Sequence, residues 1–197
     1  HISNLPKDNY AYHSSILNKK LIFEYLNNRE QYYKKVKIEV SSSHVSGKNG
    51  KELLFDKRDN TNWLSNEADW EYDLKPWIKI DLGENKNIGR INLVEPPERR
   101  SVNYKLYVSS DNVSWKNIKF NINLDKYKDK DLIILKFDST EARFFKIEIV
   151  STESKIPPAA SEVELVEDFY KNIDYNQAIS LLNYPFGYIK NNEELTD

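Results

Sequence analysis

The sequence has no cysteine, which excludes disulfides and thiolate metal sites and leaves the redox compartment open. It also has no methionine, as expected of a segment cut from a longer protein or of a chain that has lost a leader. Its five glycines leave few places for the close backbone approach that phosphate-binding loops need. No apolar run approaches the ~20 residues of a membrane-spanning helix, and residues 1–3 show no signal-peptide pattern. We therefore expect no transmembrane segment.

An excess of charge of one sign is also missing. The 197 residues include 29 basic and 31 acidic side chains, a net charge of −2, and the two signs are interspersed. No global field favours nucleic acid, so we expect none as a partner. The apolar content of 39 % and aromatic content of 13 % are enough for a core. The length suits one domain of ordinary size with extra segments.

Motifs of enzyme chemistry are absent as well. The three histidines, His1, His13 and His44, have no metal-ligand spacing, and there is no nucleophile elbow or phosphate-binding glycine loop. Acidic pairs such as Glu67 and Asp69 are typical of a solvated, charged surface. We therefore expect this chain to be non-catalytic.

From Val36 onward the chain alternates apolar and polar residues with a period of two. No long amphipathic helix separates the short strands, which predicts an all-β antiparallel sandwich or jelly roll rather than a parallel α/β sheet. The eight predicted strands are Val36–Val40, Trp77–Leu82, Ile88–Val94, Asn103–Ser109, Trp115–Phe120, Leu132–Asp138, Arg143–Val150 and Glu162–Val166.

Segments of different character flank the strands, which define one domain over residues 36–168. We interpret residues 1–35 as a connector or the end of a preceding domain. Residues 169–197 are interpreted as a C-terminal linker or accessory segment, with helical character near residues 176–182. In the first segment, apolar residues at spacings of three and four favour a helix: Ile16, Leu17, Leu21, Ile22, Tyr25 and Leu26.

A turn and the strand after it form the most distinctive part of the chain. In the turn, an acidic residue, a hydroxyl and an aromatic stand at fixed offsets, at Asp56, Thr61 and Trp63. In the strand over residues 77–83, three apolar side chains share one face, as in a half-buried strand: Ile78, Ile80 and Leu82.

These fragments resemble the discoidin or coagulation-factor type C superfamily over roughly two-thirds of the chain, from about Val36 to Asp168. Within that superfamily they are most similar to the family 32 carbohydrate-binding modules of bacterial glycoside hydrolases. The resemblance implies an eight-stranded antiparallel jelly roll of the galactose-binding-like type. The matching pieces fall in the family's order: Val40–Ser43, Asp56–Trp63, Trp77–Gly83, Tyr104–Trp115, Ala142–Ile147 and Ser161–Leu165.

The resemblance also implies a structural calcium ion, held by the turn and by a glutamate of the closing strand. It assigns Asp56, Asp59, Thr61 and Glu162 to the site, and calcium accepts such hard oxygen ligands together with backbone carbonyls. The family has a glycine after the first aspartate of the turn, and this chain has Lys57. A loop that uses a positive φ there would carry a small strain. The alternative is that Asp56 and Thr61 only satisfy the amides of their own turn.

Sugar binding in such modules uses loops at one end of the sandwich. Galactose-binding members commonly have a histidine and an arginine near the positions of Leu64 and Glu95, so a galactose prediction is not carried over. Our candidate ligand-binding residues are Trp70, Tyr72, Glu95, Arg99 and Arg100.

Each of these candidates also has a structural interpretation. A tryptophan in an acidic loop is a poor core residue, so Trp70 is either an aromatic platform or a plug under its own loop. Glu95 with Arg99 or Arg100 is either part of the ligand site or an ion pair that clamps a proline-containing loop, adding only ~0–1 kcal/mol. Three further tryptophans are expected in the core: Trp63, Trp77 and Trp115.

We therefore expect a non-catalytic carbohydrate-binding module of a larger secreted or surface bacterial protein, such as a carbohydrate-active enzyme. Its location would be extracellular, cell-surface or periplasmic. Its partners would be a glycan or polysaccharide and neighbouring domains of the same polypeptide, and the module itself would be monomeric. The alternative is a structural or protein-interaction sandwich packed against a neighbouring domain. Membrane-surface binding would need apolar loop tips, whereas the loops here are charged.

Overall fold

A computed structural model describes residues 7–58 and 60–182, with side chains described for residues 18–58 and 60–180. The chain forms two compact units. One contains the two chain ends, up to Asn28 and from Asn172, and the other spans Arg29–Lys171. The second unit is the β-sandwich and carries every candidate residue named above except Asp59, which lies outside the described residues.

The unit of the chain ends is helical. It contains most of α1 (Lys7–Lys35) and all of α3 (Tyr175–Leu182), with Asn28 as its limit on α1. On α1 the buried side chains Ile22, Tyr25 and Leu26 recur at spacings of three and four, which places them on one helical face. Within the described residues, neither helix combines the length and apolar character required to traverse a bilayer.

The sandwich is antiparallel throughout. The main sheet follows the order β1-β3-β7-β4-β5, with β6 paired to β7 and β9 paired to β3; β2 and β8 form a separate pair. Four short helices lie in the connections: η1 (Lys51–Leu54), α2 (Glu67–Glu71), η2 (Pro97–Arg99) and η3 (Asp168–Tyr170). The strands are β1 (Lys37–Val40), β2 (Trp63–Leu64), β3 (Trp77–Glu95), β4 (Ser101–Ser109), β5 (Lys116–Ile118), β6 (Asn121–Tyr127), β7 (Lys130–Thr152), β8 (Ala159–Ala160) and β9 (Glu162–Glu167).

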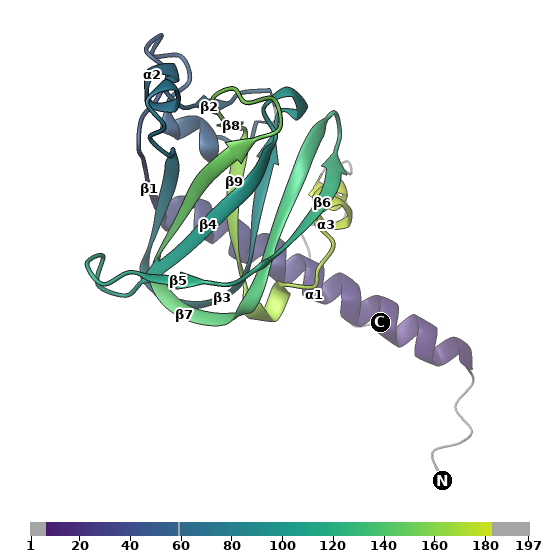
Figure 1. The fold of residues 1–197 in the computed structure, drawn as a ribbon. Coiled ribbons are helices and arrows are strands. Elements are labelled where there is room, and N and C mark those ends of the chain that lie inside the picture. Colours follow the sequence, from purple (N-terminus) through teal and green to yellow (C-terminus); the bar gives the residue numbers. More distant parts are fainter. Residues whose placement is uncertain (1–6, 59, 183–197) are drawn as a thin grey trace. The chain divides into compact units, whose positions relative to one another are not determined.

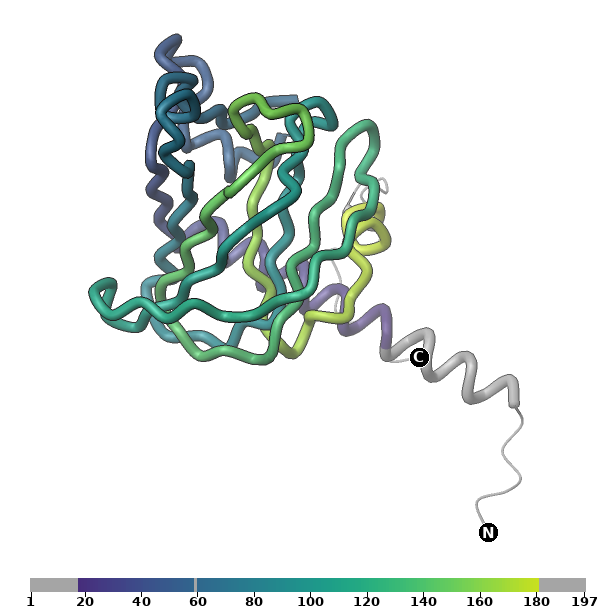
Figure 2. The backbone as a smooth tube through the Cα atoms, viewed as in Figure 1, coloured from purple at the N-terminus to yellow at the C-terminus, as the bar shows by residue number. Residues whose placement is uncertain are grey.

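Two long strands build both layers of the sandwich. The first half of β3 pairs with β1 and with the second half of β7, and the second half of β3 pairs with β9 and with the first half of β7. The strand passes from one set of pairing partners to the other where the register shifts between Asp81 and Lys86. One continuous sheet therefore folds over on itself, and Figure 2 follows the backbone through both bends at the same end of the sandwich.

The all-β sandwich is confirmed, but the strand boundaries differ from the prediction. Two pairs of predicted strands are each one continuous strand, β3 and β7, because the polar residues that we interpreted as breaks are bends within the pairing. Three strands were not predicted: β2, β6 and β8. Two of them have only two residues each, and β6 lies at a sheet edge with an almost wholly exposed, Asn- and Lys-containing sequence.

The core contains the apolar face predicted for the strand over residues 77–83, since Ile78 and Ile80 are fully buried. Leu106 on β4 and Phe145 and Ile147 on β7 are also fully buried. Trp63 is also fully buried, and its indole Nε1 donates to the carbonyl of Ser42 at 2.9 Å. The prediction for the other two tryptophans was wrong, because Trp77 and Trp115 are only half-buried. Trp115 instead lies beside the ammonium of Lys146, 5.3 Å from its ring centre.

Candidate functional site

Three loops meet at one end of the sandwich, next to the C-terminal end of β3 and the N-terminal end of β4 (Figure 1). We call residues 66–74, 96–100 and 153–158 the three-loop surface. Trp70 Nε1 donates to the carbonyl of Lys155 at 3.0 Å, and Arg99 Nη1 donates to the carbonyl of Pro157 at 2.7 Å. Two loops far apart in sequence are thus fastened to the same third loop, which brings Trp70 and Arg99 into one neighbourhood.

The first of these loops is held in shape by its own helix, α2. Asn66 caps the helix, since its side chain accepts from the amide of Ala68 at 3.0 Å. Asp73 adopts a φ of 59° directly after the helix. The ring of Tyr72 is left 78 % exposed, whereas Trp70 is half-buried. Trp70 therefore supports the loop with its indole N–H while part of its surface stays accessible.

Glu95 lies underneath this surface rather than on it. Its carboxylate has no exposed area and accepts from the amide of Ser101 at 2.6 Å and from the hydroxyl of Tyr104 at 3.2 Å. Burial raises the pKa of Glu95 to about 7, although these hydrogen bonds act in the opposite direction. Glu95 thus connects the end of β3 to β4 and fixes the segment between them, which contains Arg99 and Arg100.

Arg100 does not pair with Glu95; its ion-pair partners are Glu153 and Asp131. Its guanidinium pairs with Glu153 on the third loop and lies 3.7 Å from the buried carboxylate of Asp131. Because Glu153 itself is more than half exposed, this pair stays on the surface. The three-loop surface thus presents aromatic, guanidinium and carboxylate groups together, a set that suits a ligand with both C–H faces and hydroxyl groups.

The predicted calcium turn lies elsewhere on the sandwich. Asp56 Oδ2 accepts from the hydroxyl of Thr61 at 2.7 Å, and Asp56 Oδ1 accepts from the amide of Arg58 at 2.8 Å. Lys57 adopts a φ of 61°, so the loop does use the positive φ expected of its glycine-like position. Such hydrogen bonds satisfy the turn by themselves, as in the alternative interpretation of Asp56 and Thr61.

Glu162, on β9, has a feature that the turn alone does not explain. Its side chain is 5 % exposed, and its Oε2 accepts from the hydroxyl of Tyr33 at 3.1 Å. Its Oε1 is buried and has no hydrogen-bond partner within the part of the chain that the structure describes. Burial raises the pKa of Glu162 to about 8; Arg29 opposes this shift and Asp56 adds to it.

Arg29, at the end of α1, was not predicted to belong to this site. Its Nε lies 3.1 Å from Glu164 Oε1, its Nη2 donates to the hydroxyl of Tyr33 at 2.8 Å, and its side chain is almost wholly buried. The sequence offered no signal for this role, because Arg29 lies in a polar stretch before the first strand. The site thus combines three carboxylates, Asp56, Glu162 and Glu164, with one buried guanidinium.

The oxygen donors present are of the types that calcium binds. Calcium takes oxygen ligands from carboxylates, hydroxyls and carbonyls, and the unpartnered Oε1 of Glu162 is such a donor. The excess of negative charge beside Arg29 would be offset by a divalent cation. No group of three or more His, Asp or Glu side chains with metal-binding geometry occurs in residues 18–58 and 60–180, so carbonyl oxygens would have to complete the ligand set.

Comparison with known proteins identifies the family of the chain. The sequence model of the F5/8 type C domain family matches residues 37–163. The chain belongs to this family. The match begins after α1, so Arg29 and Tyr33 lie outside the part that this F5/8 type C domain has in common with its family.

Solved structures show the same fold. The module CpGH89CBM32-5 from Clostridium perfringens, in complex with GalNAc-β-1,3-galactose, superposes with a TM-score of 0.56 at 22 % identity, over 68 % of this chain and 97 % of that module. The family 32 module of C. perfringens NanJ, in complex with galactose, superposes with a TM-score of 0.55 at 13 % identity, over 69 % of this chain and 96 % of that module. The galactose-binding-like sandwich is therefore confirmed.

A longer relative is found among curated proteins. The chain is 27 % identical over 187 residues to an uncharacterized lipoprotein, lpp, of Mycoplasma mycoides subsp. mycoides SC. The alignment covers 90 % of this chain and 32 % of the lipoprotein. The chain thus spans about a third of the length of that relative.

Proposed function

We propose that this F5/8 type C domain is a non-catalytic carbohydrate-binding module with its ligand site on the three-loop surface. The observation that supports this most is that Trp70 and Arg99 are fastened to one loop, with Tyr72 exposed beside them. Tyr72 would stack on the C–H face of a sugar, and the guanidinium groups of Arg99 and Arg100 would donate to its hydroxyls.

A protein-packing module is the alternative, and the exposure of Tyr72 argues against it. A surface that packs against a neighbouring domain would gain most from a large aromatic side chain kept dry in a pocket. The proposed site instead has one open aromatic platform and few charged donors. We expect a Kd on the order of 0.1–1 mM for a single site of this kind.

The test is a glycan-array screen, followed by calorimetric titration of any glycan that binds, in calcium-containing buffer. Tyr72→Ala should abolish binding without loss of stability, because the side chain is 78 % exposed. Phe169→Ala is the matched control, since Phe169 is an aromatic side chain with 72 % exposure at the far end of β9. Equal binding by the wild type and Tyr72→Ala would remove the site from this surface. No binding by a folded wild-type protein would contradict carbohydrate binding.

We also propose that the module acts within a larger secreted or surface bacterial protein, which would hold it extracellularly, at the cell surface or in the periplasm. The support is the longer lipoprotein relative, together with the sugar-binding modules that have the same fold. A site of millimolar affinity becomes effective when a polypeptide presents several binding modules to one polymer.

We further propose that Asp56, Thr61 and Glu162 hold a structural calcium ion. The support is the buried, unpartnered Oε1 of Glu162 next to a cluster with an excess of carboxylates. The ion would stabilise the loops around the turn, with the sugar in contact with protein groups only.

A further inference from the structure

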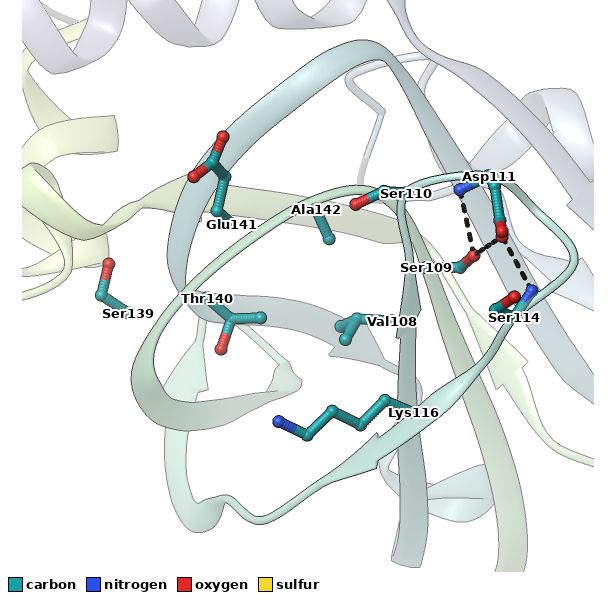
Figure 3. Close-up of a pocket in the computed structure, with 10 residues that line it drawn as sticks. All are labelled: Val108, Ser109, Ser110, Asp111, Ser114, Lys116, Ser139, Thr140, Glu141 and Ala142. Carbon is teal, nitrogen blue, oxygen red and sulfur yellow. Dashed lines mark hydrogen bonds between the residues drawn. The ribbon is translucent and has the colours of Figure 1, made fainter.

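The sandwich has a hollow at the end opposite the three-loop surface. Strand β4 has nine residues and runs from Ser101, next to η2, to Ser109. The eight steps between these two residues correspond to about 26 Å at about 3.3 Å per residue. Beyond Ser109, the turn that leads to β5 faces the bend of β7, and a cavity of about 520 Å³ lies between them (Figure 3). We call it the bend-end pocket. Its volume is within the range of about 300–1,000 Å³ typical of small-molecule sites.

One wall is a turn fixed by its own hydrogen bonds. Asp111 Oδ1 accepts from the amides of Val113 at 2.8 Å and Ser114 at 2.7 Å and from the hydroxyl of Ser109 at 2.8 Å. These hydrogen bonds hold the pKa of Asp111 well below its usual range. The carboxylate of Asp111 is therefore committed to the turn, and the wall is already formed without a ligand.

The opposite wall is the bend of β7. Arg143, which follows Ala142, makes a two-pronged contact with Asp81 on β3, at 2.6 Å and 2.9 Å. Thr140 Oγ1 donates to the carbonyl of Asp138 at 2.8 Å and keeps its acceptor capacity. This wall is thus braced against β3 while hydroxyl groups line its inner side.

The pocket combines a small apolar base with polar groups that can bind a ligand. Val108 and Ala142 form buried apolar surface. Around them lie the hydroxyls of Ser110 and Thr140 and the charged side chains of Lys116 and Glu141 (Figure 3). Neither Lys116 nor Glu141 has an ion-pair partner within 4 Å among the side chains that the structure describes. The lining therefore offers donors and acceptors with one free charge of each sign.

From this lining we propose that the bend-end pocket is a second ligand site, which takes a hydroxylated ring of the size of one or two sugar residues. A dianion such as free phosphate or sulfate is disfavoured because the carboxylates of Asp111 and Glu141 outnumber the one cation of the lining, Lys116. A lipid or aromatic ligand is disfavoured because the apolar base is small. Hydroxyls that both donate and accept suit a polyol. The unpaired charges of Glu141 and Lys116 extend the ligand class to amino sugars and uronates, respectively.

The test is a nitrogen-15 NMR titration with glucose, glucosamine and glucuronate, three monosaccharides of similar size and different charge. The proposal expects the amide signals of residues 109–116 and 138–142 to shift in a saturable manner at millimolar concentrations of at least one of them. Thr140→Val, which keeps the shape and removes the hydroxyl, should weaken all binding at this end at least threefold. Lys116→Met should weaken only the uronate, and Glu141→Gln only the amino sugar.

The two ends of the molecule are read separately in this titration. Tyr72→Ala should leave the bend-end shifts unchanged, because it lies on the three-loop surface. Shifts confined to the three-loop surface would overturn this proposal and support the first. Shifts confined to the bend end, still present in Tyr72→Ala, would support this proposal and count against the first. No saturable shift at the bend end with any of the three sugars at tens of millimolar, or shifts unchanged in Thr140→Val, would overturn it.

Discussion

At the scale of the residue, Lys57 shows how this turn departs from the pattern of its family. It occupies the position at which the resemblance to the family predicts glycine, and its φ of 61° is a conformation that glycine adopts without strain. In return its ammonium pairs with Glu30 and lies 5.5 Å from the ring centre of Tyr33. The side chain thus links the turn to the end of α1 at the expense of backbone strain.

We predict that Lys57→Gly is more stable than Lys57→Ala by about 1 kcal/mol, because only alanine retains the strained left-handed conformation. Both variants lose the exposed pair with Glu30, which contributes only ~0–1 kcal/mol. Comparing the two variants with each other therefore isolates the backbone effect. Urea unfolding measures the difference in the free energy of unfolding. Equal stability of the two variants would mean that the turn relaxes away from the positive φ.

A second residue-scale prediction concerns Glu95. Its pKa of about 7 in the folded protein exceeds the ordinary value of 4.5, so the folded state binds the proton more tightly than the unfolded chain. Its stabilising contribution is complete below pH 4.5 and is lost as the pH rises to about 7. This loss amounts to about 3 kcal/mol.

Urea unfolding across this pH window should show a smaller decline of stability with pH in Glu95→Gln than in the wild type. Glu98→Gln is the control, since Glu98 lies on the same loop and is exposed. Because Glu95 lies beneath the arginines, its ionisation would also loosen the three-loop surface. An unchanged pH slope in Glu95→Gln would show that the buried carboxylate is ionised at little cost.

The sites themselves were only partly predictable from the sequence. Asp56, Thr61 and Trp63 were recognised because their spacing is local to one turn. The order of Trp70, Arg99 and Arg100 along the chain gave no reason to expect that they would reach the loop over residues 153–158. Two of these contacts are made to backbone carbonyl groups, which every residue type has, so the sequence does not indicate them. The part played by Arg29 and Tyr33 was invisible for the same reason, since long-range contacts of a polar helix end have no local pattern.

At the scale of the element, the end of α1 is an integral part of the sandwich unit. The hydroxyl of Tyr32 accepts from the amide of Leu165 on β9 at 3.2 Å, and its ring packs edge-on against Phe55 with ring centres 6.0 Å apart. Arg29 and Tyr33 reach two glutamates of the same strand, Glu164 and Glu162. The helix end thus supplies an internal cation to the cluster that we propose to bind calcium.

We predict that calcium raises the melting temperature of the wild type, because it binds only the folded state. At a hundredfold excess over Kd the gain is about 2.7 kcal/mol, or about 5–10 °C for a chain of this size. Arg29→Met should lower the melting temperature in chelator and show a larger calcium-induced rise than the wild type, since it removes the cation that offsets Glu164. Thermal unfolding with and without chelator measures both effects.

Two further variants complete this experiment. Glu162→Gln should abolish the calcium-induced rise, because it removes a ligand charge while keeping the shape of the side chain. Lys34→Met is the control, a cation on the exposed face of the same helix. If calcium shifts neither the wild type nor Arg29→Met, the calcium proposal fails, and Arg29 alone provides the positive charge at this site.

The elements that were predicted correctly are those with one face in the core. Strands such as β4 and β9 carry apolar side chains at alternate positions, and packing of those side chains fixes the register. Strand β6 was missed because it pairs only at an edge and buries almost nothing, so its sequence is not constrained by a core. The bends of β3 and β7 were interpreted as gaps because their polar residues face solvent while the chain stays paired on either side.

At the scale of the whole molecule, the two proposed ligand sites lie at opposite ends of a rigid sandwich. A module of this kind could hold two chains of a polysaccharide, or two points on one chain, at a fixed separation. Weak binding at each end would then act together when the polymer is long enough to reach both. A glycan too short to reach both the bend-end pocket and the three-loop surface should therefore bind more weakly than a glycan long enough to occupy both.

The continuity of β3 and β7 through both layers also bears on how the protein opens. Separating the two sheets of a sandwich normally breaks side-chain packing alone, but here it would also strain two strands that belong to both sheets. Local opening of one layer is therefore opposed by the backbone ladder of the other. Amide protons in the two halves of β3 should exchange with solvent through the same rare, global event. Such a sandwich unfolds as one unit.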